Sequence, residues 1–171
     1  TQLNSWINSE EGKKLSFGII SFYRAQVNAV YKALNKYKIT KKNSSNDWEI
    51  NDEYLTIKGD GANSSEEKLR IGTVDSFQGM EFDIVFLTIV RSQDQEHIAN
   101  RKKRGIEQDA IAAGLFGHLL SENRLCVSMS RQKRLLVTVG DSDMFRTDEA
   151  KKYVTPLADY YELCQSQGQI L

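Results

Sequence analysis

The sequence has 171 residues, of which 40% are hydrophobic and 27% charged, and these values are ordinary for one globular domain over residues 1–171. Its formal net charge of zero gives no overall electrostatic preference for nucleic acid or membranes, and no apolar run is long enough for a transmembrane helix. Cys126 and Cys164 lack CxxC spacing, so we expect reduced thiols and a cytoplasmic protein. The first residue is Thr1 rather than Met, and we expect a piece of a longer protein.

The first half of the chain predicts strands and helices in alternation. The apolar run at residues 15–21 (LSFGIIS) contains β-branched side chains and predicts a buried parallel strand. Apolar residues then recur every three to four positions from Ala25 to Leu34, which predicts a helix. Residues 40–53 are polar and show no period, whereas residues 54–58 (YLTIK) alternate and predict a strand.

The second half continues the alternation. Residues 70–74 (RIGTV) and 83–90 (DIVFLTIV) predict two strands, and the second is apolar enough to be covered on both faces. The charged segment 93–120, with the run RKKR, is expected to be an exposed insertion. A helix is expected over residues 121–132, followed by a buried strand over residues 135–140 (LLVTVG).

The last helix should begin with Thr155 as its N-cap and Pro156 at its first position, and should end near Gln167. Strands that alternate with helices predict an α/β sandwich with a mainly parallel central sheet. Ligands of such sheets bind where loops leave the carboxyl ends of the strands. Residues 73–83 (TVDSFQGMEFD) are therefore expected to form a loop at that edge.

This loop offers groups that suit a phosphate or a nucleotide. The hydroxyls of Thr73 and Ser76, together with free backbone N–H groups, can bind a phosphate backbone. Gly79 permits a positive φ or a close approach of the backbone, and Glu81 could accept a hydrogen bond from a sugar hydroxyl. The alternative from local chemistry is a polar turn in which Asp75 and Ser76 cap a short helix.

A second polar segment, residues 123–134 (NRLCVSMSRQKR), places Arg124, Ser128 and Arg131 on one face of the expected helix. An arginine directed at a cleft can bind a terminal phosphate with two hydrogen bonds. The alternative is a set of basic side chains in solvent near a helix C-terminus. The histidines have no metal-ligand spacing, so no metal site is expected.

Three segments together resemble the second RecA-like domain of superfamily 1 helicases, in the Upf1-like branch that includes Dna2-type enzymes. Residues 17–26 (FGIISFYRAQ) are similar to a strand-and-turn motif often written GIITPYRAQ. Residues 73–92 (TVDSFQGMEFDIVFLTIVRS) resemble motif V with its Va extension, and residues 123–141 (NRLCVSMSRQKRLLVTVGD) resemble motif VI. The resemblance covers about residues 15–165 and implies a RecA-like three-layer sandwich of the P-loop NTPase type.

The resemblance also implies roles for individual residues. Arg131 resembles the arginine finger that reaches the γ-phosphate of ATP, and Glu81 resembles the acidic residue of the QGxE motif, with Gln78 and Gly79 in the same nucleotide-binding loop. Further residues are implied to face single-stranded nucleic acid: Thr73, Asp75, Ser76, Ser21, Tyr23 and Gln26.

The implied function is that of the C-terminal motor domain of an ATP-dependent helicase or translocase acting on single-stranded DNA or RNA. ATP and Mg²⁺ would be held mainly by the first RecA-like domain of the same protein, because this chain has no GxxxxGK(S/T) phosphate loop. We therefore expect the chain alone to be inactive. The alternative is a non-catalytic nucleic-acid-binding or interaction module derived from a helicase half. A stand-alone Rossmann-like nucleotide binder is disfavoured, since no glycine-rich fingerprint follows the first strand.

Overall fold

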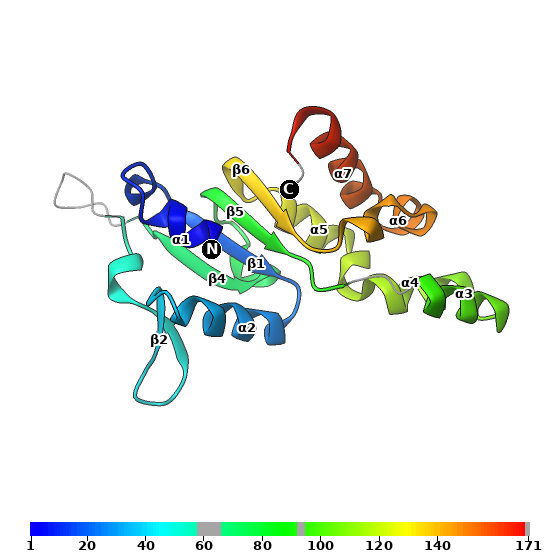
Figure 1. The fold of residues 1–171 in the computed structure, drawn as a ribbon, viewed down its shortest axis with the longest axis horizontal. Helices are drawn as coiled ribbons and strands as arrows, with labels where there is room; N and C mark the ends of the chain where they lie inside the picture. Colours follow the sequence, from blue (N-terminus) through cyan, green and yellow to red (C-terminus); the bar gives the residue numbers. More distant parts are fainter. Residues whose placement is uncertain (58–65, 92–94, 170–171) are drawn as a thin grey trace. The chain divides into compact units, whose positions relative to one another are not determined.

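The computed structural model of the chain describes residues 1–57, 66–91 and 95–169 (Figure 1). The strands are β1 (Phe17–Ser21), β2 (Thr40–Lys42), β3 (Trp48–Ile50), β4 (Leu69–Thr73), β5 (Phe82–Thr88) and β6 (Gln132–Val139). The α-helices are α1 (Gln2–Ile7), α2 (Arg24–Asn35), α3 (Gln95–Lys103), α4 (Gln108–Phe116), α5 (Glu122–Met129), α6 (Asp148–Tyr153) and α7 (Thr155–Gln167). Short 3₁₀ helices are η1 (Gly12–Lys14), η2 (Asp52–Tyr54), η3 (Val74–Phe77), η4 (Gly117–Leu120) and η5 (Ser142–Arg146).

A four-stranded parallel sheet, in the order β4-β1-β5-β6, forms the centre of the fold. β1 pairs in parallel with β4 on one side and β5 on the other, so that Ser21 is aligned with both Thr73 and Thr88. Every residue of β1 is buried, as are all residues of β5 except Thr88. The apolar runs of the sequence thus form interior strands, and the predicted RecA-like α/β fold with a parallel sheet is confirmed.

One face of the sheet is covered by α1 and α2, as Figure 1 shows for α2. Alternate residues of a strand point to the same face. The side chains of this face form one hydrophobic cluster with residues of the two helices: Leu3, Ile7, Phe17, Ile19, Val27, Leu34, Leu69, Ile71, Ile84 and Phe86. The burial of α2 explains its helical spacing, because Val27 and Leu34 lie seven positions apart on one stripe.

The chain divides into two compact units. Unit 1 comprises residues 1–88 and 127–138 and contains the sheet. Unit 2 comprises residues 89–126 and 139–171, where α7 packs against α6 and η5, and α3 packs against α4. Residues 93–120, expected as an exposed insertion, thus include two helices with buried side chains such as Ile111 and Phe116. The expectation of one domain over the whole chain stays a prediction.

One expectation for unit 1 was wrong. The described part of the expected strand 54–58, residues 54–57, contains the end of η2 at Tyr54 and an isolated bridge from Thr56 to Glu67 instead of a strand, and Lys58 lies outside the described residues. The polar segment before it contains the antiparallel hairpin β2–β3, in which Thr40 aligns with Ile50. The segment YLTIK indicated a strand because its apolar and polar residues alternate. Alternation over only five residues is also compatible with a turn.

The segment of motif VI also differs from expectation. The helix expected to reach residue 132 ends at Met129, and the strand begins at Gln132 rather than at residue 135. β6 is an edge strand with several exposed side chains, not a buried strand. Cys126, on this helix, is exposed.

Thr155 does not cap the last helix. The N-cap of α7 is Val154, while the Thr155 hydroxyl donates a hydrogen bond to the Lys151 carbonyl. The predicted end of the helix at Gln167 is confirmed. Within the described parts of the chain, no helix is long and apolar enough to span a membrane.

Candidate nucleotide and nucleic-acid site

The loop after β4 crosses the sheet along the strand direction. It runs from the side where the parallel strands end, here called the carboxyl edge, back to the side where they begin, here called the amino edge. It leaves β4 at Thr73 and enters β5 at Phe82, and because the two strands are parallel these positions lie at opposite edges. Two glycines make room for the loop along the sheet. A Cβ at Gly72 would lie 2.2 Å from the Ser76 Oγ, and a Cβ at Gly18 would lie 2.9 Å from the Phe77 ring.

The expected single site at the carboxyl edge is therefore divided. Thr73 and Ser76 lie at the carboxyl end of β4, whereas the exposed residues Gln78, Gly79 and Glu81 belong to the amino end of β5. The sequence could not show this division, because the loop reads as one polar run.

Phe77 anchors the loop in the middle of its path. Its side chain is fully buried, and its ring packs edge-on against Phe82 with 5.5 Å between centroids. Two residues later Gly79 adopts a φ of +77°, as its residue type allowed. A buried aromatic followed by this turn brings Gln78 and Glu81 out of the core and into solvent.

Arg131 lies at the same edge as this exposed turn. Arg131 was expected on the helix, but it lies in the two-residue link between α5 and β6. Its Nη1 donates to the Met80 carbonyl at 3.2 Å, and its own carbonyl accepts from the Phe82 N–H at 2.9 Å. The residues on either side of Glu81 thus both contact Arg131.

The guanidinium of Arg131 is held in place by its own unit. Nε donates to the Val127 carbonyl at 3.0 Å, and Nη2 donates to the Ser130 Oγ at 2.8 Å. With the bond to Met80, three of the five guanidinium N–H groups have acceptors in the structure. Two N–H groups of the guanidinium are then left for a ligand. The Arg131 side chain is half-buried, so this oriented cation is also partly exposed to solvent.

A buried carboxylate stabilises this amino edge. Asp83 accepts hydrogen bonds from the Ser16 N–H and hydroxyl, both at 2.9 Å, and pairs with the Arg134 guanidinium at 3.0 Å. Burial works against ionisation of Asp83, but the Ser16 hydrogen bonds and the nearby Arg134 outweigh it and lower the pKa of the carboxyl. Asp83 thus joins the segment before β1 to the start of β5.

At the carboxyl edge, hydroxyl side chains come together from neighbouring strands. The Ser21 Oγ is buried and lies 2.5 Å from the Thr88 Oγ1, which also donates to the Ile20 carbonyl. Thr88 was not predicted from the sequence, because its alignment with Ser21 depends on the register of β1 and β5. Because the Ser21 hydroxyl is buried and paired, a direct contact of this group with nucleic acid stays a prediction.

The other predicted contacts of the carboxyl edge are more accessible. Tyr23 precedes α2 as its N-cap residue, and both Tyr23 and Gln26 are half-buried. Asp75 and Ser76 are exposed. They do not cap η3, since its N-cap is Thr73 and the Ser76 hydroxyl donates instead to the Thr73 carbonyl at 2.6 Å.

The remaining polar candidates have local structural partners. Arg124 bonds the His118 ring at 3.1 Å within unit 2. Of the RKKR run, Lys102 pairs with Glu149, and the Arg101 guanidinium lies against α4. Both cysteines are free thiols. Among the residues that the structure describes, no cluster of three or more His, Cys, Asp or Glu side chains could hold a metal ion.

The parallel sheet with flanking helices defines the class as a RecA-like domain, and Arg131, in the segment that resembles motif VI, lies beside the exposed turn before β5. The chain belongs to the AAA_12 family, described as an AAA domain, whose model matches residues 2–143. It is a C-terminal RecA-like domain of the superfamily 1 helicase type.

Curated relatives are named as helicases. "Putative helicase mov-10-B.1" of Danio rerio is 32% identical over 132 residues, which are 77% of this chain and 10% of that protein. "DNA polymerase alpha-associated DNA helicase A" of Saccharomyces cerevisiae is 27% identical over 156 residues, which are 91% of this chain and 16% of that protein. "Helicase required for RNAi-mediated heterochromatin assembly 1" of Schizosaccharomyces pombe is 29% identical over 88 residues, 52% of this chain and 7% of that protein.

Proposed function

We propose that the chain is the second motor domain of an ATP-dependent helicase or translocase, in which Arg131 is the arginine finger and the carboxyl edge of the sheet is part of the single-strand track. The observation that carries the proposal is the position of Arg131. Its guanidinium is oriented by three hydrogen bonds and lies beside the exposed turn that contains Gln78 and Glu81. A cation fixed at the rim of a sheet in this way suits a phosphate supplied from outside the domain.

Residues of the chain fit one side of an ATP site. ATP supplies a terminal phosphoryl group whose transfer requires stabilisation of negative charge rather than covalent chemistry from the protein. Arg131 would direct its two remaining N–H groups at that charge, and prior orientation by Met80 and Val127 lowers the cost of reorganisation. Glu81 and Gln78 would accept or donate hydrogen bonds to the sugar or base. A phosphate loop and the Mg²⁺ ligands would come from a first RecA-like domain outside this sequence.

The track would use the carboxyl edge instead. Thr73, Asp75 and Ser76 are accessible there, together with Tyr23 and Gln26. Hydroxyl, amide and backbone groups bind phosphates without reading the base sequence. We infer that this unit binds single strands with little sequence preference, and that the separation of the two edges lets one loop contact ATP at one end and the strand at the other.

The decisive experiment is Arg131→Ala in the natural protein that contains this chain. Removing the finger is expected to lower the rate of ATP hydrolysis by about 10³- to 10⁵-fold while changing ATP affinity little, since the phosphate loop binds the ground state. Phosphate release with saturating single strands measures the rate, and titration with a fluorescent ATP analogue measures the affinity. Lys133→Ala, which removes a nearby cation paired with Glu66, is the matched control. An unchanged rate for Arg131→Ala contradicts the finger assignment.

The alternative is a non-catalytic nucleic-acid-binding or interaction module. It predicts strand binding with no dependence of any hydrolysis on Arg131. Comparing single-stranded DNA with single-stranded RNA as activators in the same assay would also identify the track. Stimulation by either one, lost in Arg131→Ala, favours the motor over the module.

A further inference from the structure

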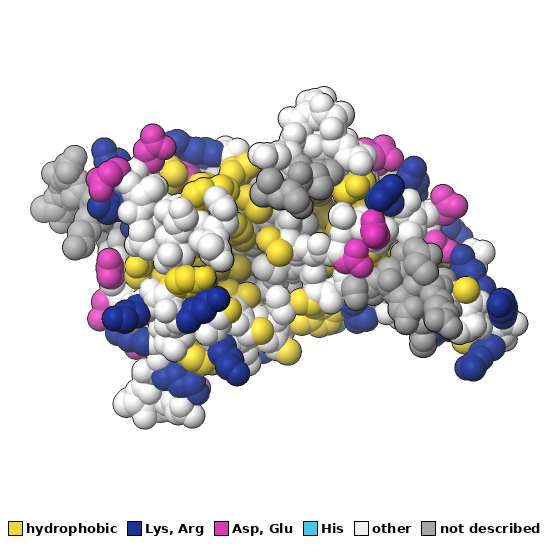
Figure 2. Space-filling model, viewed as in Figure 1, with side chains coloured by type: hydrophobic (Ala, Val, Ile, Leu, Met, Phe, Trp, Pro, Cys, Tyr) yellow, Lys and Arg dark blue, Asp and Glu magenta, His cyan; other side chains and the backbone are white. Residues whose placement is uncertain are grey.

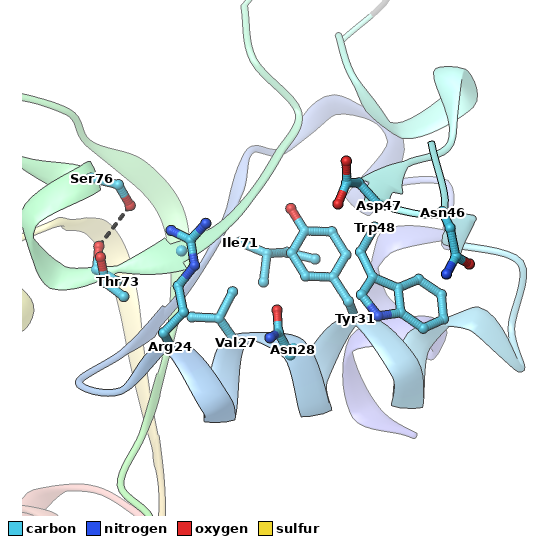
Figure 3. A pocket seen from close by; sticks show the side chains of 11 residues that line it. Arg24, Val27, Asn28, Tyr31, Asn46, Asp47, Trp48, Ile71, Thr73 and Ser76 are labelled. Atoms are coloured by element: carbon cyan, nitrogen blue, oxygen red, sulfur yellow. Dashed lines mark hydrogen bonds between the residues drawn. The ribbon is translucent and has the colours of Figure 1, made fainter. Parts of the chain in front are cut away.

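A pocket of about 650 Å³ lies beside the carboxyl edge of unit 1, and it extends from the predicted contacts Thr73 and Ser76 to residues for which no role was predicted (Figure 3). Its walls are α2, the end of β4 with η3, and the β2–β3 hairpin. The volume is within the range of about 300 to 1,000 Å³ that small-molecule sites in proteins occupy. The sequence predicts no function for the β2–β3 hairpin.

The two ends of the pocket differ in chemistry. At one end, Arg24 points toward Thr73 and Ser76, and Figure 3 shows these three side chains grouped together. At the other end lie the rings of Tyr31 and Trp48. The first group suits a phosphate and the second suits a flat ring.

Positive charge gathers around this pocket. On the face drawn in Figure 2, Lys and Arg side chains lie over α2 and the β2–β3 hairpin. Lys42 places its ammonium 5.0 Å from the Trp48 ring centroid, and Arg70 donates to the Ser76 carbonyl at 3.3 Å. Asp47 is the acidic group in the lining and lies at the ring end, where a carboxylate can accept from a base N–H.

The two aromatic rings of the pocket are partly accessible. Trp48 and Tyr31 are both half-buried, and Tyr31 also packs against the hydrophobic cluster of the sheet. The other tryptophan of the chain, Trp6, packs against the same cluster, with 5.7 Å between its ring centroid and that of Phe86. Burial raises the pKa of the Tyr31 hydroxyl.

From this arrangement we propose that the pocket binds one nucleotide of a single strand, with its base against Tyr31 and Trp48 and its phosphate near Arg24. The inference rests on the proposed track, which it extends from Thr73 and Ser76 along α2 to the hairpin. In this arrangement the β2–β3 hairpin supplies a stacking surface, Trp48, and one base of the bound strand is turned into the pocket. Stacking tolerates every base, so this pocket holds the strand without reading sequence.

Photocrosslinking tests the placement directly in the natural protein. Single strands carrying 5-iodouracil are bound, irradiated and digested, and the crosslinked peptide is identified by mass spectrometry. A crosslink at Trp48 or Tyr31, with none at Trp6, is the expected result. Strand binding with crosslinks only at other residues overturns the pocket and leaves the track proposal intact.

Affinity measurements with matched variants give a second readout. Trp48→Ala is expected to weaken strand binding by about 5- to 150-fold, and Trp48→Phe should restore most of the loss because the ring is kept. Arg24→Gln should reduce the slope of log affinity against log salt by about 0.7, the value for one phosphate of a single strand. Lys32→Gln removes the same charge from the exposed side of α2 outside the pocket lining and should leave the slope nearly unchanged. Equal slopes for the two variants contradict a phosphate at Arg24.

Two further arms separate the pocket from the motor. Arg131→Ala should abolish hydrolysis but keep the Trp48 crosslink, and a wild-type protein that crosslinks without hydrolysing ATP would contradict only the motor. A nucleoside monophosphate at millimolar concentration should compete weakly with the strand. If the mononucleotide bound at Trp48 in a protein that does not bind single strands, the strand would be excluded as the ligand of the pocket.

Discussion

At the scale of single residues, the amino edge depends on Asp83. The carboxylate accepts two hydrogen bonds from Ser16 and pairs with Arg134, while the Ser16 hydroxyl also accepts from the Asp83 N–H. Each of these bonds connects strands that are distant in sequence. The next residues toward the N-terminus are Phe82 and Glu81, so the position of the candidate ATP loop follows from the position of Asp83.

Asp83→Asn should therefore destabilise the chain by about 1 to 3 kcal/mol, because the amide cannot replace a carboxylate that accepts from both Ser16 and Arg134. The folded pKa of Asp83 is lowered, so its stabilisation is fully present above the unfolded pKa of about 4 and is lost as pH falls through the folded value. Urea unfolding between pH 7 and pH 3 measures this. The difference between wild type and Asp83→Asn should shrink at the acid end, and a constant difference would contradict the assignment.

At the scale of elements, the loop from β4 to β5 is held by its hydrophobic centre. Polar residues on both sides of Phe77 are exposed, yet the ring is buried between Gly18 and Phe82. A polar loop crossing a sheet needs such an anchor, since burial of an aromatic side chain offsets the entropy of ordering the residues around it. The chemistry at both ends of the loop then depends on one side chain that makes no contact with a ligand.

Phe77→Ala is expected to lower the free energy of unfolding by about 3 to 5 kcal/mol, as the removal of a buried aromatic ring leaves a cavity. Phe77→Leu should lose less than half of that, because most of the volume is kept. Chemical unfolding followed by circular dichroism measures both variants. Equal stability of Phe77→Ala and wild type would show that the ring is not the anchor of the loop.

At the scale of the whole molecule, the proposed function gives the chain one half of an ATP site. The chain contains segments that resemble motifs V and VI but no GxxxxGK(S/T) loop. The chain spans 10% of the length of "Putative helicase mov-10-B.1" and 16% of that of "DNA polymerase alpha-associated DNA helicase A". An arginine finger without a phosphate loop has no bound phosphate on which to act.

The purified 171-residue chain should for this reason show no ATP hydrolysis above background, while it retains some affinity for single strands. Phosphate release measures the first property and fluorescence anisotropy of a labelled strand the second. A cooperative thermal unfolding transition confirms that the chain is folded in both assays. Turnover by the chain that disappears in Arg131→Ala would mean that the site is complete without another domain.

The amino-acid sequence alone was enough to predict the α/β class, the parallel strands at β1, β4 and β5, and the family. The interior strands are apolar throughout, and this pattern is local to each segment. The motif segments are also local, so Arg131, Glu81 and Thr73 could be selected before any coordinates. Gly79 permitted either a positive φ or a close backbone approach, and the structure shows the positive φ.

Only the tertiary structure decided where these residues meet. Arg131 beside Met80, Ser21 paired with Thr88 and Trp48 facing α2 are contacts between residues far apart in the sequence, and their formation depends on strand order and register. Parallel pairing sends the loop after β4 across the sheet, which divides one polar run between two edges. Periodicity and motif spacing describe neighbours along the chain, so they do not show that the loop from β4 to β5 crosses the sheet.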